Sequence, residues 1–294
     1  ATNLFDAASG FGGYRESGFG REGGREGMWE YLKQVRGLEW KGPKDALVRR
    51  TAYSVQRTGA VPAPALASVG SAVDRTAKLF IGGKQSRPDS GYSRPVLSPR
   101  GKLLGEVGDG NRKDLRNAVE AAHAAAKGWS TSTGHLRAQI LFYIGENLDV
   151  RRDEFAARIA AMTGGTAKDG RREVDATVQR LFTYAAWADK WDGAVHNVPI
   201  RGVALAMHEP IGVVGAAAPE AAPLLGFVSV VAPLVATGNT VVAIPGESSP
   251  LSATDLYQVF ETSDLPGGVV NIVTGAKDAL ARTLAEHDDV DAVW

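Results

Sequence analysis

The chain has 294 residues, long enough for one large domain or two smaller ones. Lysine plus arginine and aspartate plus glutamate number 33 each, so the net charge is zero and no electrostatic footprint favours a nucleic-acid partner. The sequence contains no cysteine, which excludes disulfides, zinc–thiolate sites and thiol catalysis within these residues.

A glycine-rich run, FGGYRESGFGREGGREGMWEYLKQV, occupies residues 11–35. It resembles the C-terminal end of an aldehyde dehydrogenase, whose pattern P-F-G-G-Y-K-x-S-G-x-G-R-E-x-G recurs here with Gly10 in place of the proline. The resemblance implies that residues 1–42 are the end of a first unit, that Phe11 lines a substrate tunnel, and that a strand over 31–38 adds to a partner's sheet. Phe11 as a core anchor for the glycine loop is an equally weighted alternative.

The same run contains G-x-G-x-x-G from Gly18 to Gly23. This spacing marks a dinucleotide site only where a hydrophobic strand precedes it. Residues 12–17, GGYRES, are polar, so we expect no phosphate-binding role here.

Residues 43–75 have the composition of a linker. A basic stretch gives way to QRTGAVPAPALASVG, in which Pro62 and Pro64 favour extended backbone. The basic cluster is interpreted as a solvated face rather than a partner site, and it consists of Lys41, Lys44, Arg49 and Arg50.

A second start follows at Leu79. LFIGGK (79–84) and VLSPRGKLLGEV (96–107) resemble the opening strands of an aldehyde dehydrogenase. Three helices are then expected, the first capped by Asn111 with Asp114 at its third position, the second over 137–162 in two parts, and the third over 174–191. The apolar stripe of the third is predicted to be core and comprises Val178, Leu181, Phe182, Ala185 and Trp187.

The segment HNVPIRGVALAMH (196–208) alternates around Gly202 and predicts a protruding β-hairpin. An exposed two-stranded ribbon is marginal alone, so it must pair with something. In the resembled family the matching hairpin builds the subunit interface, which implies a homo-oligomer, namely a dimer. We hypothesise that the hairpin packs against the first unit.

Strand and helix patterns alternate through residues 209–252. The expected strands cover 211–215 and 240–244, and the expected helices cover 224–236 and 250–263. This alternation predicts an α/β fold with a doubly wound, right-handed, parallel Rossmann-like sheet. Its ligand crevice should lie beyond the C-terminal ends of the strands, at the turns 217–222 and 245–249.

Residues 211–236 carry one charge and resemble a membrane span in hydropathy, but three prolines, three glycines and Glu220 argue against one. The five histidines are scattered without an i, i+4 pair, so no metal site is expected. No signal pattern opens the sequence, and we expect a cytoplasmic location.

The runs EPIGVVGAAAPEAAPL and GNTVVAIPGESSPLS resemble the aldehyde dehydrogenase patterns E-P-x-G-V-x-x-x-x-P-W-N-F-P-L and G-N-T-x-V-x-K-P-S-E-x-x-P-L-S. Glu220, Ala221 and Ala222 stand where the family has Trp, Asn and Phe. The family's Asn donates its amide to the oxyanion of the reaction. Ala221 has no donor, and loss of one such donor costs on the order of 10²–10³ in rate. Glu220 is expected to repel the developing oxyanion.

The second run departs from the family at the cofactor. Ile244 and Gly246 replace Lys and Ser of K-P-S-E, and the resemblance gives that Lys a contact with the adenosine ribose. Ile244 cannot make this contact. Glu247 remains as a vestigial cofactor-binding residue, with a solvated glutamate ahead of a helix as the alternative.

LPGGVVNIVTG (265–275) matches a further family pattern, and a strand begins at Val290. The family's cofactor glycine motif, general-base Glu and nucleophilic Cys come later in its sequence order. The order here is thus the end of one unit, a linker, and at 76–294 the first part of a second, degenerate unit. This arrangement resembles the tandem family-16 aldehyde dehydrogenases.

The resemblance implies an NAD- or NADP-dependent oxidation of a small aldehyde to a carboxylic acid, carried out by the first unit, with a noncatalytic second unit. The alternative is a wholly noncatalytic scaffold with the same fold. A free-standing fragment is disfavoured because a half-sheet would expose an open edge.

Overall fold

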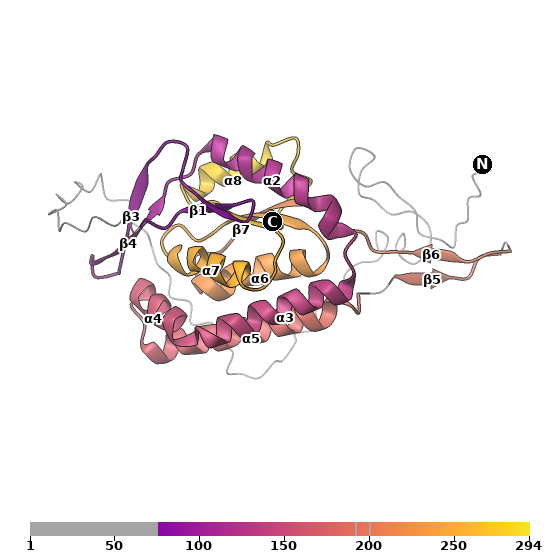
Figure 1. The fold of residues 1–294 in the computed structure, drawn as a ribbon, viewed down its shortest axis with the longest axis horizontal. Coiled ribbons are helices and arrows are strands. Elements are labelled where there is room, and N and C mark those ends of the chain that lie inside the picture. Colours follow the sequence, from indigo (N-terminus) through magenta and orange to yellow (C-terminus); the bar gives the residue numbers. More distant parts are fainter. Residues whose placement is uncertain (1–75, 192, 200) are drawn as a thin grey trace, which may run out of the picture. The chain divides into compact units, whose positions relative to one another are not determined.

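The structure is a computed structural model that describes residues 76–191, 193–199 and 201–294 (Figure 1). Within them, residues 76–196 and 203–294 form one compact unit. The expectations for Phe11, for the rest of residues 1–42 and for the linker 43–75 lie outside the described residues and stay predictions.

A six-stranded sheet with the order β10-β7-β8-β9-β1-β2 forms the centre of this unit. The strands are β1 (Leu79–Ile81), β2 (Lys84–Ser86), β7 (Val213–Ala217), β8 (Thr240–Ile244), β9 (Val270–Ile272) and β10 (Ala292–Val293). Strands β10, β7, β8 and β9 are parallel, which confirms the predicted parallel α/β sheet. Strand β1 runs antiparallel to both β9 and β2, so the sheet is mixed at this edge.

Helices cover both faces of the sheet (Figure 1). Helices α2 (Arg112–Ser130) and α8 (Lys277–Ala285) pack on one face, while α6 (Pro223–Ala236) and α7 (Leu251–Glu261) pack on the other. Because both faces are covered, β7 and β8 are buried along almost their whole length. Their sequences, VVGAA and TVVAI, accordingly read as continuous apolar runs rather than alternating ones.

Three further helices lie beyond α6 and α7, namely α3 (Gly134–Val150), α4 (Arg152–Thr163) and α5 (Ala167–Ala188). The predicted break in the second long helix is confirmed at Arg151, which separates α3 from α4. The predicted cap of α2 is also confirmed, since Asn111 and Asp114 form a reciprocal capping box.

Two expectations for α5 are corrected. The helix begins at Ala167, well before residue 174, because Thr166 and Asp169 form a second capping box. Trp187 was assigned to the core but is 56% exposed. The buried stripe of α5 passes through Leu181, Ala185 and Ala188, and Trp187 lies two positions from Ala185, on the outward side.

The corner between α6 and β8 confirms the predicted helix stop. Gly238 has φ of 88°, and a Cβ atom there would lie 2.9 Å from Pro210 Cγ. The Asn239 side chain accepts from Gly212 N at 3.0 Å and donates to Thr237 Oγ1 at 2.9 Å. These contacts fix the start of β8 against the entry to β7.

Two small antiparallel sheets complete the described residues. One pairs β3 (Ser93–Leu97) with β4 (Leu103–Gly108), and the other pairs β5 (Ala194–His196) with β6 (Ala204–Ala206). The second is the predicted hairpin, and its strands lie at 194–206, slightly N-terminal to the expected span.

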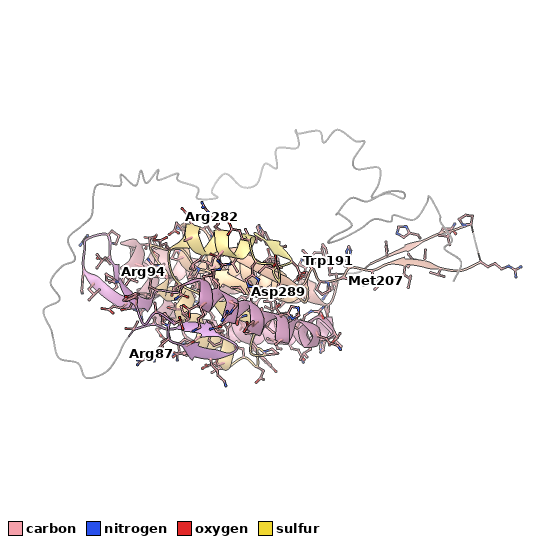
Figure 2. All side chains as sticks on the ribbon, turned by 90° about the horizontal axis from the view of Figure 1, so that it is seen from above. Arg87, Arg94, Trp191, Met207, Arg282 and Asp289 are labelled. Carbon is pink, nitrogen blue, oxygen red and sulfur yellow. The ribbon has the colours of Figure 1, made fainter. Side chains whose placement is uncertain are left out.

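The β5–β6 ribbon carries a row of exposed apolar side chains on one face. Val195 of β5 pairs directly with Leu205 of β6. Val203 and Met207 lie two residues before and two residues after Leu205, so their side chains point to the same face of the ribbon as Leu205 (Met207 is labelled in Figure 2). All four are exposed by 61% or more. A row of exposed apolar side chains on a two-stranded ribbon is typical of surfaces that pack against another apolar surface.

Candidate functional site

The crevice predicted by the topology lies where the order of strands reverses. The chain runs from β7 to β8 to β9 across the sheet and then returns to place β10 on the other side of β7. In open α/β sheets the ligand binds at such a point, beyond the C-terminal ends of the strands. The loops that follow β7, β8 and β9 therefore form the candidate site.

A carboxylate from the loop after β7 reaches across to the loop after β8. Glu220 Oε1 accepts a hydrogen bond from Glu247 N at 2.8 Å. Glu220 Oε2 accepts from Ser248 N at 3.1 Å and from Ser248 Oγ at 2.8 Å. Lys277, after β9, places Nζ 3.4 Å from Glu220 Oε1. One carboxylate thus joins the ends of three neighbouring strands.

Lys277 and Glu247 extend this network. Lys277 Nζ donates to Ala218 O at 2.5 Å, and Lys277 N donates to Glu247 Oε2 at 3.0 Å. Arg94 of β3 lies with Nη1 at 4.0 Å from Glu247 Oε1. The Glu247 carboxylate is therefore already engaged by two elements of its own chain.

The environment of Glu220 favours its ionised form. Burial raises the pKa of Glu220, but the hydrogen bonds from Glu247 N and Ser248, together with the charge of Lys277, outweigh it and hold that pKa below the usual range. Its contribution to stability is thus present above the ordinary glutamate pKa and is lost as the pH falls. The sequence predicted that Glu220 lies beside the reacting atoms. It did not predict the hydrogen bonds that Glu220 accepts from Glu247 and Ser248, because no sequence motif indicates them.

The position of the expected oxyanion donor carries an exposed methyl group. Ala221 is exposed and offers no side-chain donor. The next residue, Ala222, has φ of 51° and ψ of 71° and precedes Pro223, the first residue of α6. The methyl side chain of Ala222 has no hydrogen-bond acceptor, so it cannot cap this helix.

A carboxylate from α5 supplies the missing cap. Glu173 Oε1 accepts from Leu224 N at 2.8 Å and from Leu225 N at 3.2 Å. Burial raises the pKa of Glu173, and the two hydrogen bonds lower that pKa by less, so it lies above the ordinary value of 4.5. The two free N–H groups at the start of α6 are thus bound to the protein itself.

Replacing Glu173 tests this cap. Glu173→Ala is expected to lower the free energy of unfolding by about 1–2 kcal/mol, because two N–H groups lose their acceptor.

Glu173→Gln keeps the acceptor oxygen and removes the buried charge. Because the folded chain binds this proton more tightly than the unfolded chain, the wild-type protein should lose stability relative to Glu173→Gln as the pH rises from 4.5 through the raised pKa. Urea unfolding between pH 4 and 7.5 measures the difference, and an opposite slope would contradict the assignment.

Ile244, which stands at the expected ribose-binding position, belongs to the core. Its side chain is fully buried on the face covered by α2 and α8, where it packs with Val242, Leu280 and Leu284. It therefore offers nothing to the crevice. Of the residues that the sequence singled out here, Glu220 and Glu247 present polar side chains at this edge.

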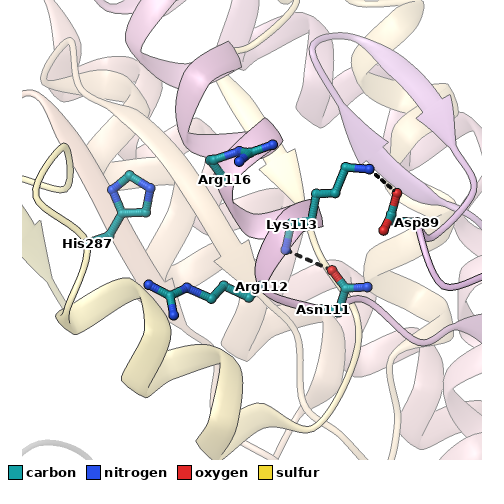
Figure 3. A pocket seen from close by; sticks show the side chains of 6 residues that line it. All are labelled: Asp89, Asn111, Arg112, Lys113, Arg116 and His287. Atoms are coloured by element: carbon teal, nitrogen blue, oxygen red, sulfur yellow. Dashed lines mark hydrogen bonds and ion pairs between the residues drawn. The ribbon is translucent and has the colours of Figure 1, made fainter.

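A separate pocket of about 650 Å³ lies at the start of α2 (Figure 3). Its lining is mainly basic, and most of its polar groups already have partners. Lys113 Nζ binds Asp89 Oδ1, Lys113 N donates to Asn111 Oδ1, and Arg116 pairs with Glu120. The remaining lining residues are Arg112 and His287.

Across 76–191, 193–199 and 201–294, no group of three histidine, aspartate or glutamate side chains is placed to hold a metal ion. Over the same ranges, no helix has both the length and the apolarity needed to cross a bilayer.

Comparison with known proteins identifies the family. A family model described as "Aldehyde dehydrogenase family" matches residues 86–294. An aldehyde dehydrogenase of Agaricus bisporus is 32% identical over 220 residues, covering 73% of this chain and 44% of that protein. A mitochondrial benzaldehyde dehydrogenase of Antirrhinum majus is 35% identical over 221 residues, covering 73% and 41%. The chain thus spans less than half the length of these relatives.

Solved structures agree. An NAD-dependent aldehyde dehydrogenase from Sinorhizobium meliloti superposes with a TM-score of 0.71 at 27% identity, covering 75% of this chain and 45% of that one. A betaine aldehyde dehydrogenase from Staphylococcus aureus, solved in complex with NAD+, gives 0.71 at 26% identity, covering 74% and 45%. The α/β sheet and its two helical layers are accordingly those of this fold. The chain belongs to the aldehyde dehydrogenase family.

Proposed function

We propose that residues 76–294 form a noncatalytic unit within an NAD(P)-dependent aldehyde dehydrogenase that oxidises an aldehyde to a carboxylic acid. Residues 1–42, whose glycine-rich run resembles the end of such an enzyme, belong in this proposal to a preceding catalytic unit that binds the cofactor. Phe11 then lines that unit's substrate tunnel. The arrangement is that of a tandem, family-16-like protein.

The observation that carries the proposal is the chemistry of the loop after β7. Aldehyde oxidation needs hydrogen-bond donors aimed at the oxyanion of the tetrahedral intermediate. Ala221 offers a methyl group there, and the adjacent Glu220 adds a carboxylate held by Glu247, Ser248 and Lys277. Neither side chain offers a hydrogen-bond donor to the negative charge that develops on the carbonyl oxygen.

The residues of the crevice do not fit a bound nicotinamide dinucleotide. Ile244 is buried in the core and cannot reach a ribose. Glu247, which the resemblance assigns to ribose hydroxyls, is engaged by Lys277 N and lies close to Arg94. We keep Glu247 in the proposal as a vestigial contact, and assign the working cofactor site to the first unit.

A second candidate function is that of a scaffold without catalysis in either unit. The exposed apolar row of the β5–β6 ribbon favours a role in assembly, whichever unit carries the chemistry. We propose that this ribbon packs against another aldehyde dehydrogenase unit and gives a homo-oligomer, such as a dimer. We also propose a cytoplasmic location, supported by the cysteine-free composition.

Isothermal titration with NAD separates these possibilities. The 294-residue chain, checked for cooperative thermal unfolding, is expected to bind no NAD, because Ile244 cannot contact the ribose and Glu247 is engaged by Lys277. The longer tandem polypeptide is expected to bind one NAD per chain. Stoichiometric binding by the 294-residue chain, or two sites in the longer one, would overturn the noncatalytic assignment. Absence of binding by both would favour the scaffold.

A further inference from the structure

Two departures from the family pattern contact each other across neighbouring loops. Glu220 stands in the loop after β7, where the family has Trp, and Gly246 stands in the loop after β8, where the family has Ser. A Cβ atom on Gly246 would lie 3.2 Å from Glu220 Oε2 and 3.1 Å from Pro219 O, closer than most Cβ atoms approach another atom. Gly246 does not have a positive φ, so its backbone does not require glycine. The absent side chain therefore leaves the space in which the Glu220 carboxylate lies.

Because that space is free, the Glu220 carboxylate bonds to the loop after β8 through both of its oxygens. Oε1 accepts from Glu247 N at 2.8 Å, and Oε2 accepts from Ser248 N at 3.1 Å and from Ser248 Oγ at 2.8 Å. The Glu220 side chain is 47% exposed, so water competes for these bonds and each of them contributes modestly. Together, three bonds to one planar carboxylate hold the two loops in one relative position.

A second carboxylate and two cations extend this contact to two further elements. Lys277, at the start of α8, places Nζ 3.4 Å from Glu220 Oε1 and donates through its backbone N to Glu247 Oε2 at 3.0 Å. Arg94 of β3 places Nη1 4.0 Å from Glu247 Oε1 and donates from Nη2 to Gly275 O at 3.5 Å. The two negative and two positive charges balance each other. We call Glu220, Glu247, Lys277 and Arg94 the strand-end clasp.

From these contacts we propose that Glu220 and Gly246 are a matched pair, and that the clasp which they complete orders the loops after β7, β8 and β9 without any ligand. Loops that bind ligands commonly belong to the least stable parts of a fold. Here side chains of the protein itself make the contacts that keep the loops in place. The inference rests on the proposed function, because it explains how loops that lack catalytic side chains keep one conformation in a noncatalytic unit.

Amide hydrogen exchange of the 294-residue chain tests the clasp at the backbone N–H groups of Glu247 and Ser248. Glu220→Ala removes the acceptor of both groups and is expected to lower their protection factors at least about tenfold. Glu220→Gln keeps one acceptor oxygen and loses the charge, so its loss of protection should be smaller. Glu146→Ala is the matched control, because Glu146 is an exposed glutamate on α3, and it should leave both protection factors unchanged.

Gly246→Ala tests whether the two departures form a pair. In the wild-type background the added methyl group is expected to displace the Glu220 carboxylate and to lower the protection factors of Glu247 and Ser248 about as much as Glu220→Ala does. In the Glu220→Ala background the same change should lower them less than about twofold further, because the carboxylate that it displaces is already absent. This non-additivity distinguishes a matched pair from two separate losses.

Protection factors that stay unchanged in Glu220→Ala, while the variant unfolds cooperatively on heating, would overturn the proposal. An equal loss in Glu146→Ala, or an effect of Gly246→Ala that has the same size with and without Glu220, would overturn it as well. If Glu220→Ala does not fold, Glu220→Gln takes its place in both comparisons. Failure of the proposed function would appear separately, as NAD binding by the wild-type chain, and does not change the outcome expected of these exchange measurements.

Discussion

Replacing Asn271 by leucine is expected to lower the free energy of unfolding by about 3–5 kcal/mol. The Asn271 side chain is fully buried in β9. Its Oδ1 accepts from Gly82 N at 2.9 Å, and its Nδ2 donates to Gly268 O at 2.8 Å and to Val241 O at 3.3 Å. Leucine has a similar volume but leaves these buried groups without their partner, at about 1–3 kcal/mol for each unsatisfied group.

Urea unfolding followed by far-UV circular dichroism measures this loss. Asn117→Leu is the matched control, since Asn117 is exposed on α2, and its effect should stay within about 0.5 kcal/mol. Equal losses in the two variants would show that the Asn271 bonds contribute little. A loss confined to Asn271→Leu would show that one side chain joins β9 to the turn between β1 and β2 and to the neighbouring strand β8.

Asn271 also shows why matching a family motif does not by itself predict activity. The motif residues that this chain keeps, Asn239 and Asn271, make buried hydrogen bonds that close corners of the fold. Those it lacks are the side chains that the family uses for chemistry, at Ala221 and Ile244. Selection for the fold alone would produce this division, because the structural residues act through packing and the others through ligands.

The sequence predicted the parallel part of the sheet well. Strand β8 has the predicted bounds of 240–244, and α6 begins one residue before the predicted 224. Both are apolar runs bounded by residues with a strong backbone preference, Pro223 at the start of the helix and Gly238 after it. The antiparallel edge formed by β1 was not predicted as part of this sheet, because pairing between residues almost two hundred positions apart leaves no local pattern.

The loops of the candidate site were predicted, but the contacts between them were not. The turns at 217–222 and 245–249 follow β7 and β8 as predicted, and their role in binding a ligand stays a prediction. The hydrogen bonds of Glu220 and Glu173 were not predicted. Each carboxylate accepts from backbone N–H groups of a distant loop or helix, and almost every residue of a sequence carries such a group, so no sequence pattern marks the partners. Together they occupy the free donors at the start of α6 and after β8. Both donor sets that a ligand would meet at this edge are thus held by the protein's own negative charges.

The ribbon formed by β5 and β6 gives the second large prediction. Val203→Asp is expected to weaken association with another aldehyde dehydrogenase unit by about 100-fold, because an unpaired carboxylate would be buried in an apolar contact. Val203 is 70% exposed and extends the row of Val195 and Leu205. Sedimentation velocity of the 294-residue chain measures self-association, and limited proteolysis of the proposed tandem polypeptide would measure release of the two proposed units.

Val150→Asp is the control for that experiment. Val150, at the end of α3, is 86% exposed, so the same change is made on an apolar side chain away from the ribbon. It should alter neither sedimentation nor proteolysis. If Val203→Asp behaves as this control does, the ribbon does not hold units together, and its exposed row needs another explanation. If only Val203→Asp dissociates the protein, the unit has kept its assembly surface while losing the side chains of catalysis, which is the pattern expected of a structural partner to an active unit.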